Sequence, residues 1–267
     1  MKNLFKILAV LSAMTLFVAC SDDDDPTDPT PTAAGELTVK SQFLSQNRII
    51  VENVTFKEDG WIVVHADNNN QPLTPDIISV AVPVEAGTHE DVVIPLSEDA
   101  NMLSGNTKVW VMLHTDDGVK GQYEFDGVSG TDGPLKDLDS NVIMSAITLQ
   151  PATITSDAQS VTNKVSIVSV TAAVDGWLVI HNDDGNGNMV VPGIIGRTKV
   201  SAGLNQNVEV TLNLGVIIEP GQKLFPMLHI DNGEKDKYEF PSADPAEVFG
   251  FDEEGNPIVI FTEIDVL

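Results

Sequence analysis

The feature that most constrains this chain is a sequence pattern that occurs twice, about 115 residues apart. The first copy contains Gly60-Trp61-Ile62-Val63-Val64-His65, then Met112-Leu113-His114-Thr115-Asp116, then Tyr123-Glu124-Phe125. The second contains Gly176-Trp177-Leu178-Val179-Ile180-His181, then Met227-Leu228-His229-Ile230-Asp231, then Tyr238-Glu239-Phe240. This recurrence predicts two copies of one module, which we name module 1 (36–150) and module 2 (151–267). At about 115 residues, each module is long enough to bury its own hydrophobic core.

Short apolar segments rich in Val, Ile and Thr fill both modules, and clusters of Gly, Asn, Asp and Pro separate them. Strands are predicted in module 1 at 49–56, 61–66, 77–84, 92–96, 108–114, 121–125 and 142–149. In module 2 they are predicted at 165–171, 177–181, 194–200, 208–212, 223–229, 236–240 and 258–264. Seven short strands per module indicate an all-β chain of two tandem antiparallel immunoglobulin-like β-sandwich domains.

The N-terminus has the features of a targeting segment. Lys2 and Lys6 precede an apolar run, 7–18, that is too short to span a bilayer comfortably. The run ends at Cys20, the only cysteine of the chain, in a context that resembles a bacterial lipobox. The resemblance implies a signal peptide at 1–20, and a Cys20 that is acylated and anchors the protein in a membrane.

The segment that follows Cys20 is acidic and then proline-rich. Residues 22–25 are four aspartates, which resemble the export signal of lipoproteins displayed on the outer membrane of some Gram-negative bacteria. The prolines up to residue 31 favour an extended spacer, so 21–35 is predicted to be a stalk. The formal net charge of −26 argues against nucleic acid and anionic lipid surfaces as partners.

Together, the Gly-Trp-x-Val-x-His, Met-Leu-His-x-Asp and Tyr-Glu-Phe motifs resemble a poorly characterised β-sandwich domain of secreted and lipid-anchored prokaryotic proteins, often found in tandem. The resemblance covers nearly all of residues 36–267. It implies a fold, but it implies no established activity.

The paired histidines are the first candidate site. Residues two apart in a strand share a face, so Trp61 and His65 point the same way, and so do Met112 and His114. Each module thus offers two histidines at strand ends and one methionine beside a histidine. Imidazole and thioether are a ligand set suited to copper, especially Cu(I). The candidate copper ligands are His65, Met112, His114, His181, Met227 and His229. The same pattern is also typical of a sandwich core with histidines at strand ends. A blue-copper redox site is excluded, because the modules contain no cysteine.

Calcium is the second candidate cation. Loops rich in Asp, Asn and Gly follow the histidines, and oxygen-rich loops suit a hard cation. The candidate calcium ligands are Asp116, Asp117, Asp183, Asp184 and Asp231. These residue types are also ordinary in turns, and the run that starts at Asp184 does not fit the EF-hand pattern.

The function predicted from the sequence is therefore a non-enzymatic lipoprotein of the outer membrane, exposed at the cell surface, with a binding or adhesion-type role toward an unidentified ligand. The alternative is a metal-binding envelope lipoprotein that takes copper or calcium. No catalytic motif such as Gly-x-Ser-x-Gly, His-Glu-x-x-His or a Walker loop occurs. A hydrolase without a recognisable motif stays open as a weaker alternative.

Overall fold

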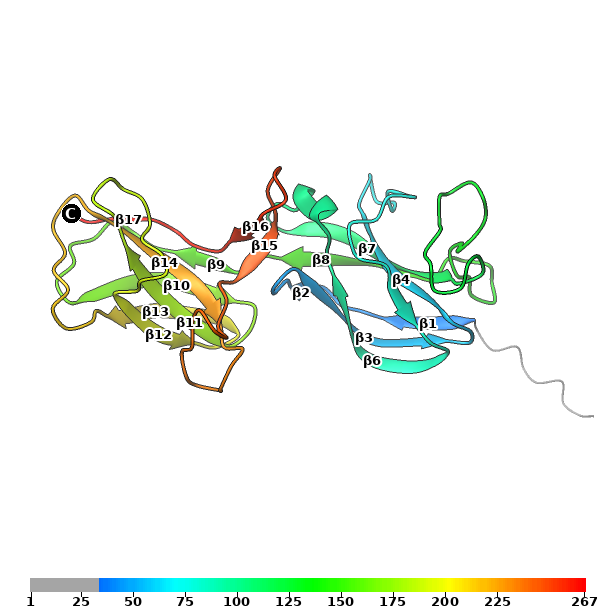
Figure 1. Ribbon diagram of the computed structural model, residues 1–267, viewed down its shortest axis with the longest axis horizontal. Helices are drawn as coiled ribbons and strands as arrows, with labels where there is room; N and C mark the ends of the chain where they lie inside the picture. Colours follow the sequence, from blue (N-terminus) through cyan, green and yellow to red (C-terminus); the bar gives the residue numbers. More distant parts are fainter. Residues whose placement is uncertain (1–33) are drawn as a thin grey trace, which may run out of the picture. The chain divides into compact units, whose positions relative to one another are not determined.

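The computed structural model describes residues 34–267, in which β-strands are joined by turns and loops (Figure 1). The predicted signal peptide, Cys20 and almost all of the predicted stalk lie outside the described residues. Among residues 34–267, no helix is long and apolar enough to cross a membrane.

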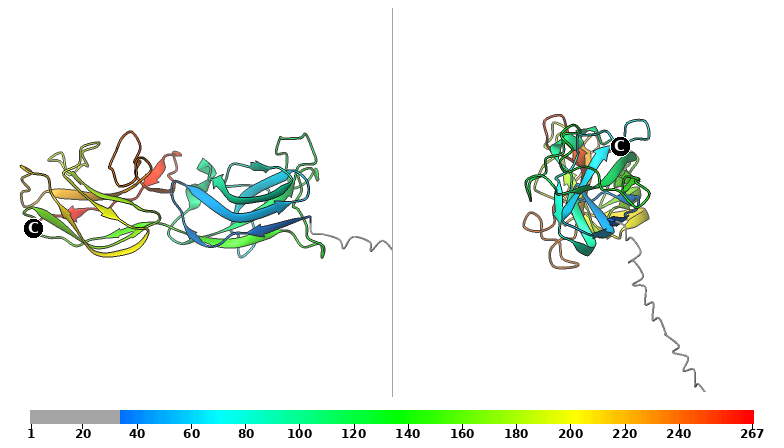
Figure 2. Two further views of the ribbon diagram at one scale, coloured as in Figure 1. Left: turned by 90° about the horizontal axis from the view of Figure 1, so that it is seen from below. Right: turned by 90° about the vertical axis from the view of Figure 1, so that its right-hand side faces the viewer.

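Module 1 is a sandwich of two sheets (Figures 1 and 2). The smaller sheet has the order β1-β3-β6, formed by Gly35–Thr38, Arg48–Phe56 and Gly87–Pro95. The larger sheet has the order β2-β8-β7-β4-β5, formed by Gln42–Phe43, Met144–Gln150, Thr107–Thr115, Gly60–Ala66 and Val82–Val84. All pairs are antiparallel except β2 with β8, which is parallel.

Module 2 repeats this arrangement with one strand fewer in its larger sheet. One sheet has the order β13-β10-β9, formed by Gly203–Thr211, Lys164–Ala172 and Thr153–Thr155. The other has the order β12-β11-β14-β17, formed by Gly196–Val200, Gly176–Asn182, Lys223–Ile230 and Ile264–Asp265. A separate hairpin joins β15 (Val248–Phe251) to β16 (Pro257–Val259). The predicted all-β fold of tandem sandwiches is confirmed.

The central strand β4 is buried on both faces, as its uninterrupted apolar sequence requires. Ile62 and Val64 point into the sandwich core between the two sheets. Trp61, Val63 and His65 alternate with them, so they point to the outer face of the larger sheet, yet they are buried as well. The interpretation of the Trp-Val-His face as part of the sandwich core is therefore wrong, because loops cover this outer face.

Module 2 shows the same division between two apolar clusters. Leu178 and Ile180 belong to the sandwich core, whereas Trp177, Val179 and Met227 form a separate cluster on the outer face. Each module therefore contains a second, smaller core beneath its loops.

Some strand predictions are wrong. Residues 121–125 and 236–240 are turns and loops, with left-handed backbone at Gly121 and Asp236. The predicted strand 77–84 is reduced to β5, and 258–264 is divided between β16 and β17. Strands β1, β2, β9 and β15 were not predicted, and each has four residues or fewer. Such short segments are too brief for a period of two to be recognised.

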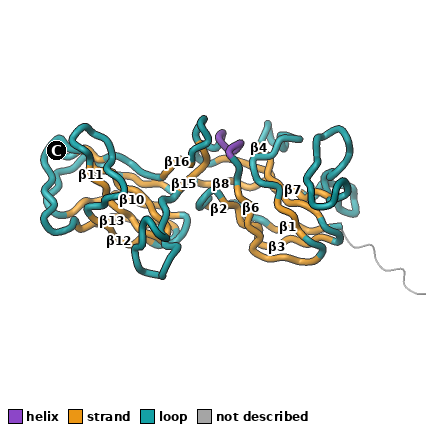
Figure 3. The backbone as a smooth tube through the Cα atoms, viewed as in Figure 1, coloured by secondary structure: helices purple, strands orange, loops and turns teal. Residues whose placement is uncertain are grey.

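The β15–β16 hairpin packs against module 1, although it lies late in the sequence of module 2. Phe249 belongs to the sandwich core of module 1, and Figure 3 shows the hairpin beside the 3₁₀ turn η1 (Glu98–Met102). The buried carboxylate of Glu247 accepts hydrogen bonds from Ser45 Oγ at 2.8 Å and from the Gln46 backbone amide at 2.9 Å. Residues of module 2 thus complete the fold of module 1.

Candidate functional site

The two histidines of module 1 lie side by side on the outer face of the larger sheet. Strands β4 and β7 are neighbours, and their register pairs Trp61 with His114 and Val63 with Met112. His65 itself lies opposite Trp110, so the Val63–Met112 pair stands between the two histidines along the strands. Their rings nevertheless approach to a centroid distance of 5.8 Å, with 36° between their planes. Both histidine side chains are completely buried, at 0% exposure.

One nitrogen of each ring is bonded to a backbone carbonyl. His65 Nδ1 lies 2.7 Å from the Asp76 carbonyl oxygen, and His114 Nδ1 lies 2.7 Å from that of Asp132. Because a carbonyl only accepts, each Nδ1 carries the proton and donates it. In the neutral ring Nε2 is then an acceptor, and both Nε2 atoms are buried without a hydrogen-bond partner among residues 34–267.

Burial keeps the two rings neutral. It lowers the pKa of His65 and lowers the pKa of His114 to about 4, with proximity to His65 adding to the effect on His114. A neutral imidazole with a free Nε2 lone pair is the form that binds metal ions. At neutral pH the pair is therefore ready to act as a ligand.

The spacing of the rings fits one shared metal ion. Two imidazoles that bind one ion through Nε2 bonds of about 2.0–2.1 Å have ring centres roughly 5–6 Å apart. Met112 adds a thioether on the same face, and it is as deeply buried as the histidines. The donor set His65, His114 and Met112 therefore suits a soft ion such as Cu(I).

Module 2 repeats this geometry. The rings of His181 and His229 have a centroid distance of 6.2 Å and an interplanar angle of 32°. His181 Nδ1 lies 2.8 Å from the Gly193 carbonyl oxygen, and His229 Nδ1 lies 2.8 Å from that of Asp244. Both Nε2 atoms again have no partner, and Met227 lies in register with Val179. The six predicted copper ligands are thus brought together as two sets of three.

Aromatic side chains form the wall of each cluster. In module 1 the Tyr123 ring lies 5.7 Å from Trp61 and 5.6 Å from His114, and Phe125 lies 4.7 Å from His114. Burial raises the pKa of Tyr123, so its hydroxyl stays protonated. Trp61 Nε1 and Tyr123 Oη are also buried without a partner, as are the matching Trp177 and Tyr238 atoms. Four unpartnered polar atoms therefore border the cluster in each module.

The Tyr-Glu-Phe motif belongs to the segment that covers the histidines, which we call the covering loop (116–133 in module 1, 231–245 in module 2). In module 1 the loop is organised by Asp132, which is fully buried. Its carboxylate accepts from the Asp117 amide at 3.0 Å and the Glu124 amide at 2.7 Å, while its own carbonyl holds His114. One residue therefore fixes both the loop and the tautomer of the histidine.

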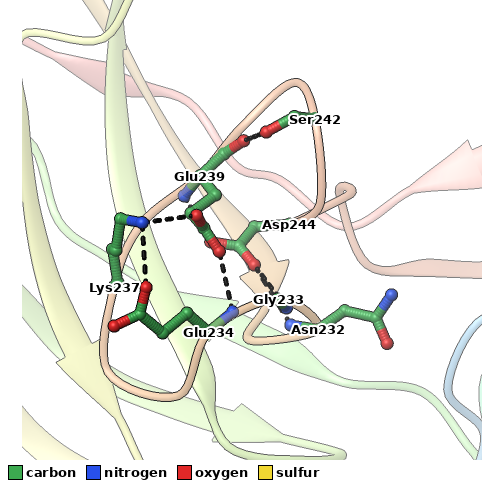
Figure 4. A network of polar contacts seen from close by, with 7 residues as sticks. All are labelled: Asn232, Gly233, Glu234, Lys237, Glu239, Ser242 and Asp244. Atoms are coloured by element: carbon green, nitrogen blue, oxygen red, sulfur yellow. Dashed lines mark hydrogen bonds and ion pairs between the residues drawn. The ribbon is translucent and has the colours of Figure 1, made fainter.

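Asp244 has the same role in module 2. Its carboxylate accepts from Asn232 N at 3.1 Å and from Glu239 N at 2.7 Å (Figure 4). The Glu239 carboxylate in turn accepts from Glu234 N at 2.7 Å and pairs with Lys237 at 2.8 Å. The sequence prediction missed both organising aspartates. Asp132 follows His114 by 18 residues, whereas Asp244 follows His229 by 15. A comparison of the two copies at one fixed spacing therefore does not align the two aspartates.

The carboxylates of all five predicted calcium ligands accept hydrogen bonds from backbone amides, most of them within turns. Asp116 accepts from Gly121 N, Asp117 from Asp132 N, Asp183 from Gly185 N and Lys223 N, Asp184 from Asn186 N, and Asp231 from Asp236 N. In the described part of the chain, no three or more His, Cys, Asp or Glu side chains are grouped so that they could hold a metal ion. Calcium binding stays a prediction, and these contacts account for the aspartates as turn residues.

Comparison with solved structures finds chains of similar arrangement at low sequence identity. CBD12 from CALX1.2 is 9% identical, with 87% of this chain and 99% of that chain covered and a TM-score of 0.24. The Salmonella enterica SafA pilin with the SafB chaperone is 10% identical, with 74% and 91% covered and a TM-score of 0.27. A Mobiluncus mulieris adhesin is 9% identical, with 88% and 97% covered and a TM-score of 0.23.

No curated protein matches the chain. The model of one family, described as "Domain of unknown function (DUF7282)", matches residues 35–150 and again residues 152–262. These two segments hold the two histidine clusters and make up most of the sequence, so the chain belongs to the DUF7282 family and contains two copies of its domain.

Proposed function

We propose that this chain is an envelope lipoprotein that binds Cu(I) at two buried sites, one in each module. The observation that carries the proposal is the state of the four histidines. Each donates Nδ1–H to a backbone carbonyl and keeps an unpartnered Nε2 beside the Nε2-bearing ring of a second histidine. A histidine that binds a metal ion commonly has its other nitrogen fixed in this way.

A purely structural role explains this arrangement less well. A buried polar atom without a partner costs about 1–3 kcal/mol, and apolar side chains of similar size would avoid that cost. The outer face of the sheet is already packed by Trp61 and Val63, so burial alone does not call for two imidazoles. In module 2 the Nε2 atoms of both histidines are likewise buried without a partner, so the feature occurs in both copies of the domain.

The donor set favours Cu(I) over other ions. Thioether sulfur is a soft ligand, and a set of two imidazoles and one thioether is neutral and offers no carboxylate. Hard ions such as calcium prefer six or more oxygen ligands. Structural zinc sites have four protein ligands, whereas each module supplies three.

We also propose that Cys20 carries the lipid anchor and that the protein is displayed on the outer membrane, on the basis of the lipobox-like and acidic segments. An adhesion-type role, which the sequence suggested first, stays a prediction, as does the absence of enzymatic activity. The buried histidine pairs favour metal binding, because adhesion through the protein surface would not require histidines in the interior.

Anaerobic titration with Cu(I) tests the proposal. Residues 21–267, purified without chelator or histidine tag, should bind two Cu(I) ions in competition with a colorimetric Cu(I) chelator. Ligand at about a hundred times its dissociation constant should stabilise the fold by about 2.7 kcal/mol, which a thermal melt detects. X-ray absorption should show sulfur scattering that the double variant Met112→Leu, Met227→Leu removes.

The histidine variants provide the control. His65→Gln with His114→Gln should reduce the stoichiometry from two ions to one, and the same changes at His181 and His229 should abolish the remaining site. His89→Gln is the matched control, because His89 lies on the other sheet and bonds the Glu85 carbonyl. Binding that is absent, or that survives all four changes, would overturn the proposal.

A further inference from the structure

The two candidate copper sites differ in the charge that surrounds them. In module 2, strand β12 carries Arg197 and Lys199 beside the aromatic wall. The Arg197 guanidinium lies 5.3 Å from the centre of the Tyr238 ring and 6.0 Å from that of Trp177. Lys199 Nζ lies 5.1 Å from the Trp177 ring centre. Two cations are thus held against the rings that border the His181–His229 pair.

Module 1 has no charge at the matching positions. Pro83 is paired with Trp61 in the register of β4 and β5, as Lys199 is paired with Trp177 in that of β11 and β12. Ala81, two residues before Pro83, takes the place of Arg197. The aromatic wall of module 1 is therefore bordered here by uncharged residues.

Module 1 instead has carboxylates on the approach to its site. A cavity of about 580 Å³ reaches Tyr123 and Phe125, the two rings that touch His114. Asp76 and Asp99 also line this cavity. Module 2 has Gly193 and Gly215 at the positions that correspond to these two aspartates, since the carbonyl of Gly193 holds His181 as that of Asp76 holds His65. Both at the aromatic wall and at this cavity, the surroundings of the module 1 site are thus more negative than those of the module 2 site.

We propose that the two sites are unequal: module 1 binds Cu(I) first and more tightly, and Arg197 and Lys199 weaken the site of module 2 for a cation. This inference rests on the proposed copper function. Because Lys199 pairs with Asp236, Arg197 supplies the larger part of the effect. One unit charge at this range, in surroundings of intermediate dielectric and partly screened by solvent, changes the affinity for a monovalent cation roughly tenfold.

The experiment measures each site alone in the 21–267 chain. The background His181→Gln with His229→Gln leaves only the module 1 site, and His65→Gln with His114→Gln leaves only the module 2 site. Competition with a Cu(I) chelator should give a module 1 site that is about tenfold tighter at low salt, with a smaller difference at high salt. Adding Arg197→Gln and Lys199→Gln to the second background should raise its affinity about tenfold.

Two further variants make the test specific. Lys164→Gln removes a lysine from the opposite sheet of module 2, where it pairs with Glu209, and it should leave the affinity unchanged. Ala81→Arg introduces the missing charge in module 1 and should weaken its site. Equal affinities, a tighter module 2 site, or no gain from Arg197→Gln with Lys199→Gln would overturn this inference while copper binding stands. Absence of Cu(I) binding in both backgrounds would instead refute the proposed function.

Discussion

Replacement of Phe249 by alanine should destabilise module 1, although Phe249 lies in the second of the two family segments. Its side chain is 5% exposed and packs in the sandwich core of module 1. Removing a buried phenylalanine side chain costs about 3–5 kcal/mol through lost burial and the cavity left behind. A domain of this size has a total stability of about 5–15 kcal/mol, so the loss is a large share of it.

Urea unfolding and hydrogen exchange locate this effect. Trp61 and Trp110 report on module 1 and Trp177 reports on module 2, and these are the three tryptophans of the chain. In Phe249→Ala, the unfolding midpoint of module 1 should fall, and amides of β3 and β7 should exchange faster while those of β10 and β13 do not.

Phe261→Ala is the control, because Phe261 lies in the same C-terminal segment, is 46% exposed and packs against Phe225 of module 2. It should cost far less and spare module 1. An unchanged module 1 midpoint in Phe249→Ala, or faster exchange confined to module 2, would refute the assignment of the hairpin to the core of module 1.

Three further changes test the site and the anchor. Asp132→Ala removes charge-assisted hydrogen bonds to two backbone amides and should cost about 3 kcal/mol, with faster hydrogen exchange in the covering loop of module 1 and weaker Cu(I) binding there. Burial lowers the pKa of His114 to about 4, whereas unfolded histidine protonates near 6.5. The unfolded state therefore takes up the proton first as the pH falls, so His114 alone should account for a loss of about 3 kcal/mol between pH 6.5 and 4, and urea titrations of His114→Gln should show a correspondingly shallower slope. Cys20→Ser should abolish incorporation of labelled fatty acid and release the protein from the membrane fraction.

The face of the strand on which each histidine lies could be predicted from the sequence because it depends on local rules. Alternation along a strand places Met112 and His114 on one face, as it does Trp61 and His65, whereas the pairing of the two strands that brings the histidines together is not given by any local pattern. The complete burial of the two histidine side chains could not be predicted in the same way. Strand β4 is apolar on both faces, so its pattern does not tell which face meets the second sheet and which lies under loops.

The Tyr-Glu-Phe segments show how a local pattern misleads. Tyr123 and Phe125, two residues apart, both contact His114, and aromatic residues at this spacing are also typical of one face of a strand. Between them Glu124 closes a turn, because its carboxylate accepts from the Val119 amide at 2.6 Å. Phe249 escaped prediction for a different reason: its core partners in module 1 lie far earlier in the chain, and no short-range pattern reports such a contact.

The two modules carry the same site but support it differently. In module 2, Asp244 holds His229 through its carbonyl, and three residues later Glu247 is anchored to Ser45 and Gln46 of module 1. The segment that fixes this histidine is therefore fastened at its far end to the neighbouring module. In module 1, Asp132 holds His114 within a loop that closes on itself through Asp117 and Glu124. The module 2 loop also closes on itself, through the bonds of Asp244 to Asn232 and Glu239, so its anchor on module 1 is an additional support that the module 1 loop does not share.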